Sequence, residues 1–331
     1  MKALVTGGGG FLGGAIVRAL CKRGDTVVSF SRQRYSALDA LGVTQIQGDL
    51  ADPAAVSAAA KGCEIIYHVA ALPGVWGRYN DFYRANVVGT DNVLAACAAH
   101  GIDKLVYTSS PSVVFNGRDM EGVDESVPYP AHFEAFYPQT KALAEQRVLT
   151  ANSAQLATVS LRPHLIWGPN DNHLVPRILA RGRAGQLRRI GKRPCLVDTI
   201  YVDNAAEAHL QAADHLTIGS PVAGKAYFIA QGEPLPLWEM VNRILASADL
   251  PPVERSVPAS VAYAAGFCLE KLYTLLRLPQ EPRLTRFVAR ELSTAHWFDL
   301  SAACRDFGYA PRVSLDEGLR RLRASLQGAT P

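Results

Sequence analysis

A tyrosine and a lysine four residues apart, Tyr137 and Lys141, are the residues of this chain best suited to proton transfer. On a helix this spacing puts both side chains on one face, where they can reach the same substrate oxygen. A phenol is a weak acid at neutral pH, and an adjacent ammonium group favours its ionised form and lowers its pKa. The pair therefore predicts a proton donor for a carbonyl oxygen. The alternative is a solvated helix face without a chemical role.

A glycine-rich turn lies near the start of the chain, between an expected strand and an expected helix. Its glycines fit two dinucleotide-binding spacings, one beginning at Gly7 and one at Gly8, and both include Gly10 and Gly13. Glycine lets the backbone approach a pyrophosphate, and the helix N-terminus supplies amide donors and the positive end of the helix dipole. We expect this turn to bind the cofactor through Gly7, Gly10, Phe11, Leu12 and Gly13.

The choice between NAD(H) and NADP(H) is expected at the end of the second strand, residues 26–31. An acidic residue there would bind the adenosine ribose hydroxyls and repel a 2′-phosphate. The sequence instead has Ser31 and Arg32 at this point, whereas Asp25 lies at the opposite end of the strand. Arginine and serine hold a phosphate through charge-assisted hydrogen bonds. We therefore predict NADP(H), the alternative being that Arg32 and Arg34 are plain surface arginines.

The elements that must position these residues alternate between short apolar runs and helical patterns, which is typical of a parallel sheet with crossover helices. We expect strands at 3–6, 26–31, 44–47, 65–69, 104–109 and 158–162. We expect helices at 11–23, 81–100 and 137–152. The predicted fold class is α/β, with a doubly wound, Rossmann-type parallel sheet.

A second, smaller region is indicated where proline and glycine become frequent in the later half of the chain. We predict a dinucleotide-binding domain at 1–170 and a return of the chain to it near 197–216, with 199–202 rejoining the sheet. The interleaved substrate-binding region would then comprise 171–196 and 217–331.

The composition is that of an ordinary globular protein of 331 residues, with 48% hydrophobic and 19% charged residues. A net charge of +4 is too small to indicate nucleic-acid binding. The six cysteines are widely separated, which favours reduced thiols over a disulfide framework or a metal site. No signal peptide precedes the first expected strand, so we expect a cytoplasmic protein.

An apolar segment at 259–278 is interrupted by Glu270, Lys271 and Arg277, which argues against a membrane span. It suits a helix of the core, a lid over long alkyl chains, or a helix resting on a membrane surface. A basic stretch at 177–193 is either a solvated helix face and loop or a site for a substrate carboxylate or an acidic partner.

Taken together, Tyr137-x-x-x-Lys141 and Thr6-Gly7-x-x-Gly10-x-x-Gly13 resemble the motifs of the extended short-chain dehydrogenase/reductase family. Further matching stretches are Gly48-Asp49-Leu50, His68-Val69-Ala70-Ala71, Asn86-Val87-Val88-Gly89-Thr90, Thr108-Ser109-Ser110 and Arg162-Pro163. Within the family the chain looks most like the 3β-hydroxysteroid dehydrogenase branch. It is similar there to sterol-4α-carboxylate 3-dehydrogenases and to the bacterial 2-alkyl-3-oxoalkanoate reductases of long-chain olefin biosynthesis. The stretches that carry this are 108–115, 162–169 and 224–229.

The resemblance implies roles for residues at the matching positions. Tyr137 would be the general acid in ketone reduction, and Lys141 would bind the nicotinamide ribose and lower the pKa of the phenol. Ser110 would hydrogen-bond the same substrate oxygen, with Ser109 as the alternative. The remaining cofactor contacts implied by the family are Asp49 and Leu50 at the adenine and Ala70 in the cleft wall. Roles outside the reaction are implied for Asn86, which would hold a helix beside the site, and for His68, in the cleft wall. His164 would either pack in the core or touch a substrate carboxylate.

The resemblance also implies a small-molecule substrate, a hydrophobic β-keto acid, reduced by NADPH to a 3-hydroxy acid. Alternatives are a hydroxysteroid or sterol-carboxylate dehydrogenase, a nucleotide-sugar epimerase or reductase, and a dinucleotide-binding scaffold without catalysis. The family further implies a homodimer formed through the helices at 81–100 and 137–152, and assembly with other olefin-pathway enzymes is the partner hypothesis.

Overall fold

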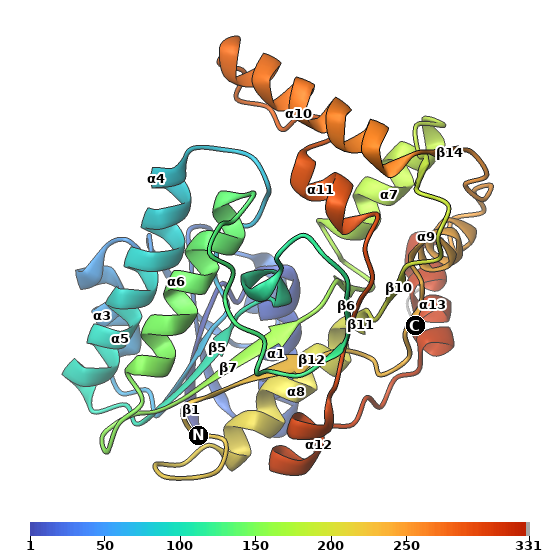
Figure 1. Ribbon diagram of the computed structural model, residues 1–331. Helices are drawn as coiled ribbons and strands as arrows, with labels where there is room; N and C mark the ends of the chain where they lie inside the picture. The colour runs from blue at the N-terminus through green and yellow to red at the C-terminus, as the bar shows by residue number, and fades with distance from the viewer. Residues whose placement is uncertain (329–331) are drawn as a thin grey trace.

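A seven-stranded sheet forms the centre of the computed structural model, which describes residues 1–328 (Figure 1). Its strands lie in the order β12-β7-β5-β4-β1-β2-β3, and all neighbours are parallel. They are β1 (Lys2–Thr6), β2 (Thr26–Ser31), β3 (Thr44–Gln47), β4 (Ile65–His68), β5 (Lys104–Thr108), β7 (Ala157–Pro163) and β12 (Lys225–Ile229). Strands covered on both faces are apolar almost throughout, and Ala3, Leu4 and Val5 are fully buried. The predicted fold class is confirmed.

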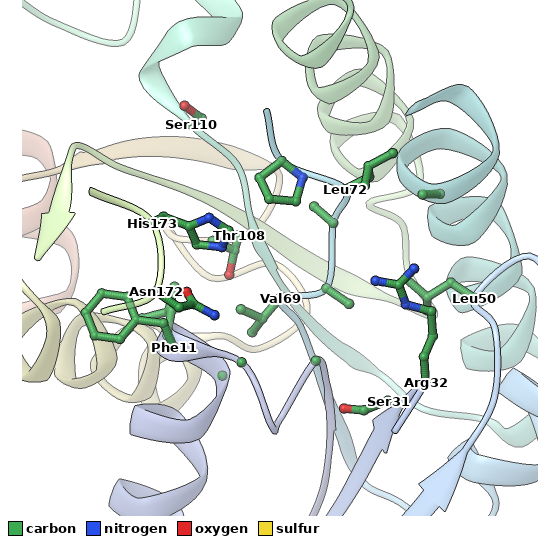
Figure 2. Close-up of a pocket in the computed structure, with 18 of the residues that line it drawn as sticks. Phe11, Ser31, Arg32, Leu50, Val69, Leu72, Thr108, Ser110, Asn172 and His173 are labelled. Atoms are coloured by element: carbon green, nitrogen blue, oxygen red, sulfur yellow. The ribbon is translucent and has the colours of Figure 1, made fainter. Parts of the chain in front are cut away.

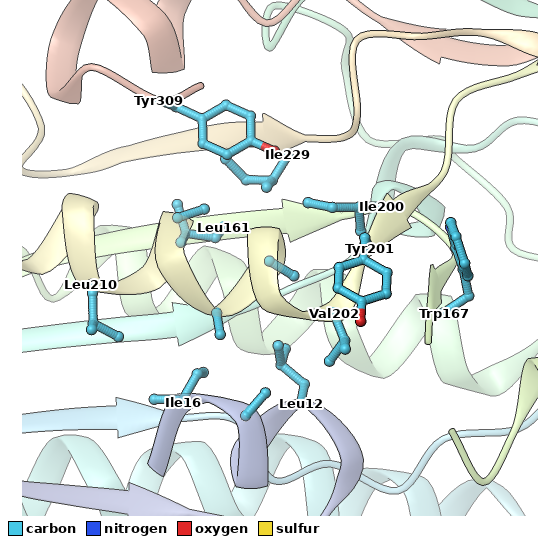
Figure 3. Close-up of a cluster of buried hydrophobic side chains, with 14 of the residues drawn as sticks. Leu12, Ile16, Leu161, Trp167, Ile200, Tyr201, Val202, Leu210, Ile229 and Tyr309 are labelled. Carbon is cyan, nitrogen blue, oxygen red and sulfur yellow. The ribbon is translucent and has the colours of Figure 1, made fainter. Parts of the chain in front are cut away.

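Helices cover both faces of this sheet. One face carries α3 (Pro53–Ala60), α5 (Gly89–His100) and α6 (Phe136–Thr150), and the other carries α1 (Phe11–Arg23) and α8 (Val202–His215). Figure 3 shows the second layer, where Leu12 and Ile16 of α1 and Leu210 of α8 point toward each other and the sheet. Burying these side chains is the main favourable term in holding the helices on the strands.

The helix expected at 81–100 spans 79–100 without a break, and its winding changes partway along. It comprises α4 (Tyr79–Phe82), a π-helical turn at Tyr83–Val88 and α5. A π-turn widens the helix locally and changes the direction of its side chains, and such turns are frequent at functional sites. Here the turn contains Asn86, whose side chain is bonded to the backbone of a neighbouring loop.

The return of the chain to the sheet was predicted at the wrong place. Residues 199–202 do not join the main sheet, because β11 (Ile200–Tyr201) pairs instead with β8 (Ile166–Trp167) in a separate two-stranded sheet. The seventh strand is β12, which lies within the range assigned to the substrate-binding region and pairs with β7. Most of the predicted return segment does belong to the main-sheet domain, because it forms α8, which packs against α1 and the main sheet.

The remaining elements form smaller sheets and helices beside the main sheet. The short strands are β6 (Met120–Val123), β9 (Arg189–Ile190), β10 (Leu196–Val197), β13 (Leu235–Pro236), β14 (Ser256–Val257) and β15 (His296–Phe298). The helices are α2 (Ser36–Asp39), η2 (Pro111–Val114), α7 (Leu174–Arg183), α9 (Leu237–Ala246), α10 (Ala259–Leu275), α11 (Arg286–Glu291), α12 (Ser301–Phe307) and α13 (Leu315–Leu326).

Helix α10 projects from the body of the molecule (Figure 1). Ala262 and Gly266 are its buried residues, whereas Leu275 is 79% exposed, so the expectation of a core helix is wrong. A Cβ on Gly266 would come within 2.7 Å of the backbone at Thr285, which explains how α10 packs so closely on the start of α11. Among residues 1–328, no helix combines the length and apolar character needed to cross a membrane.

Candidate active site

A cleft of about 1010 Å³ opens at the carboxyl ends of the main-sheet strands. This is where open α/β sheets bind their ligands. Every residue predicted for catalysis or cofactor binding lines it, apart from Lys141. These residues are Gly7, Gly10, Phe11, Leu12, Gly13, Ser31, Arg32, Asp49, Leu50, Ala70, Ser110 and Tyr137. Figure 2 shows several of them pointing into the space between the strand ends.

The glycine turn is packed so closely that larger residues would not fit. Gly7 has φ +71°, and a Cβ there would lie 3.0 Å from the Ala70 backbone. A Cβ on Gly13 would come within 2.1 Å of the Gly7 carbonyl oxygen. Gly8 does not line the cleft, and a Cβ on it would lie 2.5 Å from Ser29 Oγ. Gly7, Gly10 and Gly13 are therefore the glycines of this turn that shape the cleft.

One end of the cleft lies directly after β2 and is lined by Ser31 and Arg32. The Ser31 hydroxyl is buried and has no hydrogen-bond partner within residues 1–328, and the exposed Arg32 side chain lies beside it (Figure 2). Two other arginines nearby are already paired, Arg34 with Asp39 at 2.8 Å and Arg84 with Asp49 at 3.1 Å. An unpaired arginine next to an unsatisfied hydroxyl fits a phosphate group on the adenosine ribose.

Ser110 and Tyr137 both line the cleft, and Ser110 lies at the end opposite Arg32 (Figure 2). Ser110 follows β5 and caps η2, with its Oγ 2.9 Å from Ser112 Oγ. Tyr137 is half-buried near the start of α6. Burial raises the pKa of Tyr137 to about 12, although the nearby Ser110 hydroxyl lowers it in part and the charge of Glu291 raises it further. Tyr137 therefore keeps its proton through the neutral range.

Lys141 lies behind the cleft wall. Its Nζ donates a hydrogen bond to the Thr108 carbonyl at 2.6 Å and sits 4.1 Å from the centre of the Tyr107 ring. Burial lowers the pKa of Lys141 to about 7, against an opposing effect of Glu145. Lys141 is not among the groups that shift the pKa of Tyr137 in this structure, and the predicted effect of its ammonium on the phenol stays a prediction.

The alternative serine, Ser109, turns toward the interior. Its side chain is 4% exposed, and its buried hydroxyl has no hydrogen-bond partner within residues 1–328. Behind it, Glu145 forms a buried ion pair with Arg162 at 2.6 Å. Since Glu145 is on α6 and Arg162 on β7, this pair fixes the helix that carries Tyr137 to the sheet. The geometry favours Ser110 as the serine that meets substrate.

Buried polar side chains hold the cleft wall from behind. His68 bridges Thr6 Oγ1 at 2.8 Å and Thr90 Oγ1 at 3.0 Å, so it supports the wall without lining it. Asn86 accepts a hydrogen bond from Leu72 N at 2.7 Å and donates one to Thr140 at 3.0 Å, which ties the loop after β4 to α6.

The hypothesis that His164 touches a substrate carboxylate is not supported. Its Nδ1 is 2.6 Å from the Asp198 carbonyl oxygen, and its ring packs edge-on against His296 and Phe298. His164 is buried outside the residues that line the cleft, so packing accounts for it.

None of the arginines and lysines of the basic stretch 177–193 lines the cleft. Arg177 pairs with Glu281 at 2.7 Å and Arg193 with Asp119 at 2.5 Å, and Arg181 donates to the Arg283 carbonyl. These contacts attach α7 and the following loop to neighbouring segments, which gives Arg177, Arg181 and Arg193 a structural explanation.

Two polar residues of the cleft, Asn172 and His173, were not predicted from the sequence; they lie in the loop between β8 and α7. No spacing pattern marks them, because they follow a strand of two residues and sit in irregular backbone. A signal was present in the adjacent Gly168-Pro169-Asn170-Asp171, a run of turn-forming residues directly after a buried strand.

A parallel sheet with a glycine turn at its first crossover, and a tyrosine and a serine that line the same cleft, define a nicotinamide-dependent oxidoreductase of the Rossmann type. Comparison with known proteins agrees. Residues 4–258 match the model of the 3-beta hydroxysteroid dehydrogenase/isomerase family.

The chain belongs to this family. It is 54% identical over 327 residues to the 2-alkyl-3-oxoalkanoate reductase of Stenotrophomonas maltophilia, covering 98% of this chain and 99% of the relative. It is 35% identical over 325 residues to the decarboxylating sterol-4-alpha-carboxylate 3-dehydrogenase of Mus musculus, covering 97% and 89%. Among solved structures, the UDP-glucose 4-epimerase of Thermus thermophilus in complex with NAD matches with a TM-score of 0.74, 25% identity and full coverage of both chains.

Proposed function

We propose that this protein reduces the 3-keto group of 2-alkyl-3-oxoalkanoic acids with NADPH, giving the 3-hydroxy acids, as a step of long-chain olefin biosynthesis. The observation that carries the proposal is the arrangement of the cleft. Ser110 lies at one end and Ser31 and Arg32 at the other, and Tyr137 lines the same cleft. The 54% identical relative, which is named for this reductase activity, supports the choice of substrate class.

The residues of this chain then have separate tasks. A bound NADPH supplies the hydride. Ser110 holds the carbonyl oxygen, and Tyr137 donates the proton that the oxygen gains, which its raised pKa keeps available at neutral pH. Lys141 holds the nicotinamide ribose, and this role requires its ammonium group to turn from the Thr108 carbonyl toward the cleft.

Cofactor choice supports reduction as the direction. NADPH is the form that cells keep reduced, so an enzyme with a phosphate site works mainly on ketones. Ser31 and Arg32 offer that site, and the residues directly after β2, Arg32 to Arg34, include no carboxylate. Asp49, Leu50 and Ala70 would line the adenosine half of the cofactor.

Helix α10 is proposed to guide the alkyl chains of the substrate. Its Tyr273 packs edge-on against Trp76, in the loop whose earlier residues Leu72 and Pro73 line the cleft. At its other end, Tyr263 donates to Glu134, three residues before Tyr137. The helix thus connects the two segments that border the catalytic end, and it presents exposed apolar side chains such as Leu272 and Leu275.

Three further parts of the proposal concern assembly and location. A homodimer would form through α5 and α6. Within one chain, these two helices are joined by the ion pair of Asp91 with Arg147. Assembly with other enzymes of olefin synthesis and a cytoplasmic location complete it.

A second candidate is oxidation of a sterol carboxylate, which is favoured by the 35% identical mouse relative. NADPH or NADP⁺ turnover should be measured across β-keto acids, 3β-hydroxysteroids with and without a 4-carboxylate, and UDP-sugars. We expect consumption of NADPH with 2-alkyl-3-oxoalkanoic acids. Turnover of steroid acids alone, or of UDP-sugars alone, would replace the proposal.

A further inference from the structure

We infer that His173 binds the carboxylate of the substrate and makes the enzyme selective for β-keto acids over neutral ketones. The inference rests on the proposed function, because it names the residue that would recognise the acid group of that substrate. A β-keto acid carries its carboxylate one carbon away from the reacting carbonyl. The group that binds it must therefore lie at the catalytic end of the cleft.

The positions of the cations in the cleft single out this histidine. Among the described residues that line the cleft, those able to carry positive charge are Arg32, Arg84 and His173. Arg32 follows β2, which is separated from β5 by β1 and β4 in the sheet, and Arg84 is bonded to Asp49. The loop that carries His173 follows β7 and β8, on the side of the sheet where Ser110 follows β5.

The view in Figure 2 agrees with this topology. The imidazole of His173 points into the cleft on the side of Thr108 and Ser110, well away from Arg32. Its side chain is exposed, and within residues 1–328 no group forms a hydrogen bond with its ring. An imidazole ring without a partner can offer an N–H donor to a carboxylate.

The loop holds His173 in a defined position. The Asp171 carboxylate accepts hydrogen bonds from the backbone N–H groups of His173 at 2.7 Å, Leu174 at 3.2 Å and Val175 at 2.8 Å. Asn170, with φ +67°, completes the turn in the left-handed conformation that asparagine tolerates. The acidic group nearest to His173 in sequence is thereby committed to capping α7.

The other basic groups suggested for this task are accounted for elsewhere. His164 is bonded to the Asp198 carbonyl and packed among aromatic rings. The arginines of the stretch 177–193 lie outside the cleft lining. The cleft itself also holds Asp49, Asp81 and Asp171, but Asp49 and Asp81 are paired with arginines and Asp171 is the cap. A carboxylate at the catalytic end thus meets one basic side chain without a partner among the described lining residues, His173.

The test compares a 2-alkyl-3-oxoalkanoic acid with its methyl ester, which keeps the ketone and removes the charge. Initial rates of NADPH consumption would be measured for the wild type, His173→Gln and the control His215→Gln, an exposed histidine at the end of α8. We expect His173→Gln to lower kcat/KM for the acid about tenfold or more, as expected for loss of a charge-assisted hydrogen bond. The ester, the KM for NADPH and the control should be unaffected.

The possible outcomes separate this inference from the proposed function. An active wild type whose acid-to-ester ratio is unchanged in His173→Gln overturns the inference alone. Equal losses for acid and ester, or a raised KM for NADPH, would assign His173 to the shape of the cleft and would also overturn it. A wild type that consumes NADPH with neither compound contradicts the proposed function, and the inference fails with it.

Discussion

Replacing Arg32 by alanine should convert a strong preference for NADPH into a weak one. Arg32 is exposed and has no ion-pair partner among residues 1–328, so its removal leaves the fold intact and takes away one direct phosphate contact. A hydrogen bond to a charged group contributes about 1.5–3 kcal/mol, and solvent screening at this open site favours the lower figure. A loss of about 1.5 kcal/mol corresponds to roughly a tenfold rise in the KM for NADPH.

Steady-state kinetics with both cofactors at saturating β-keto acid would measure this change. The KM for NADH should stay within about twofold, because NADH lacks the 2′-phosphate that Arg32 contacts. Arg34→Ala is the matched control, since Arg34 lies two residues further on but is held by Asp39. The reasoning is refuted if Arg32→Ala weakens NADPH and NADH equally, or if Arg34→Ala has the same effect.

Three further predictions follow from the site and its surroundings. Ser110→Ala should lower kcat about 100-fold with little change in KM for NADPH, whereas Ser109→Ala should stay within tenfold, and the reverse order would exchange their roles. Replacing Leu272 and Leu275 together by serine should raise the KM for long-chain acids about fivefold and leave the KM for short-chain acids unchanged. Equal effects on both would show that α10 does not contact the alkyl chains of the substrate. The free energy of unfolding in urea should fall by about 2 kcal/mol from pH 7 to pH 5 for each of four buried histidines, His68, His164, His209 and His296. These histidines take up protons near pH 6.5 in the unfolded chain and remain neutral in the folded chain over this range. A flat profile over this range, or an unchanged slope in His209→Asn, would contradict this. Burial lowers the pKa of each of these histidines: His68 to about 3, His164 to about 4, His209 to about 4 and His296 to about 3.

The cofactor half of the site could be predicted from the sequence because its signals are local. The glycine turn sits between a strand and a helix, and the residue after β2 follows directly from where that strand ends. Helix α1 and strands β2 and β3 have the predicted bounds, and glycines mark the ends of α1 (Gly24) and β3 (Gly48).

The substrate half could not be predicted in the same way, because its contacts join segments that are distant in sequence. The position of His173 depends on an irregular loop and on capping by Asp171, and neither has a periodic pattern. Lys141 has the expected spacing from Tyr137, but its ammonium group is bonded to Thr108 on another strand. Strand β12 could not be assigned to the main sheet from the sequence, because its partner β7 precedes it by about sixty residues.

The central claim is that Tyr137 protonates the ketone of a β-keto acid while NADPH supplies the hydride. The most direct measurement is the stoichiometry of NADPH oxidised to 3-hydroxy acid formed from a 2-alkyl-3-oxoalkanoic acid, for the wild type and Tyr137→Phe, with NADPH binding measured in parallel. We expect one hydroxy acid per NADPH for the wild type, and loss of turnover by at least about 100-fold with intact NADPH binding for Tyr137→Phe. Full turnover by Tyr137→Phe, or no reduction of the acid by the wild type, would contradict the claim.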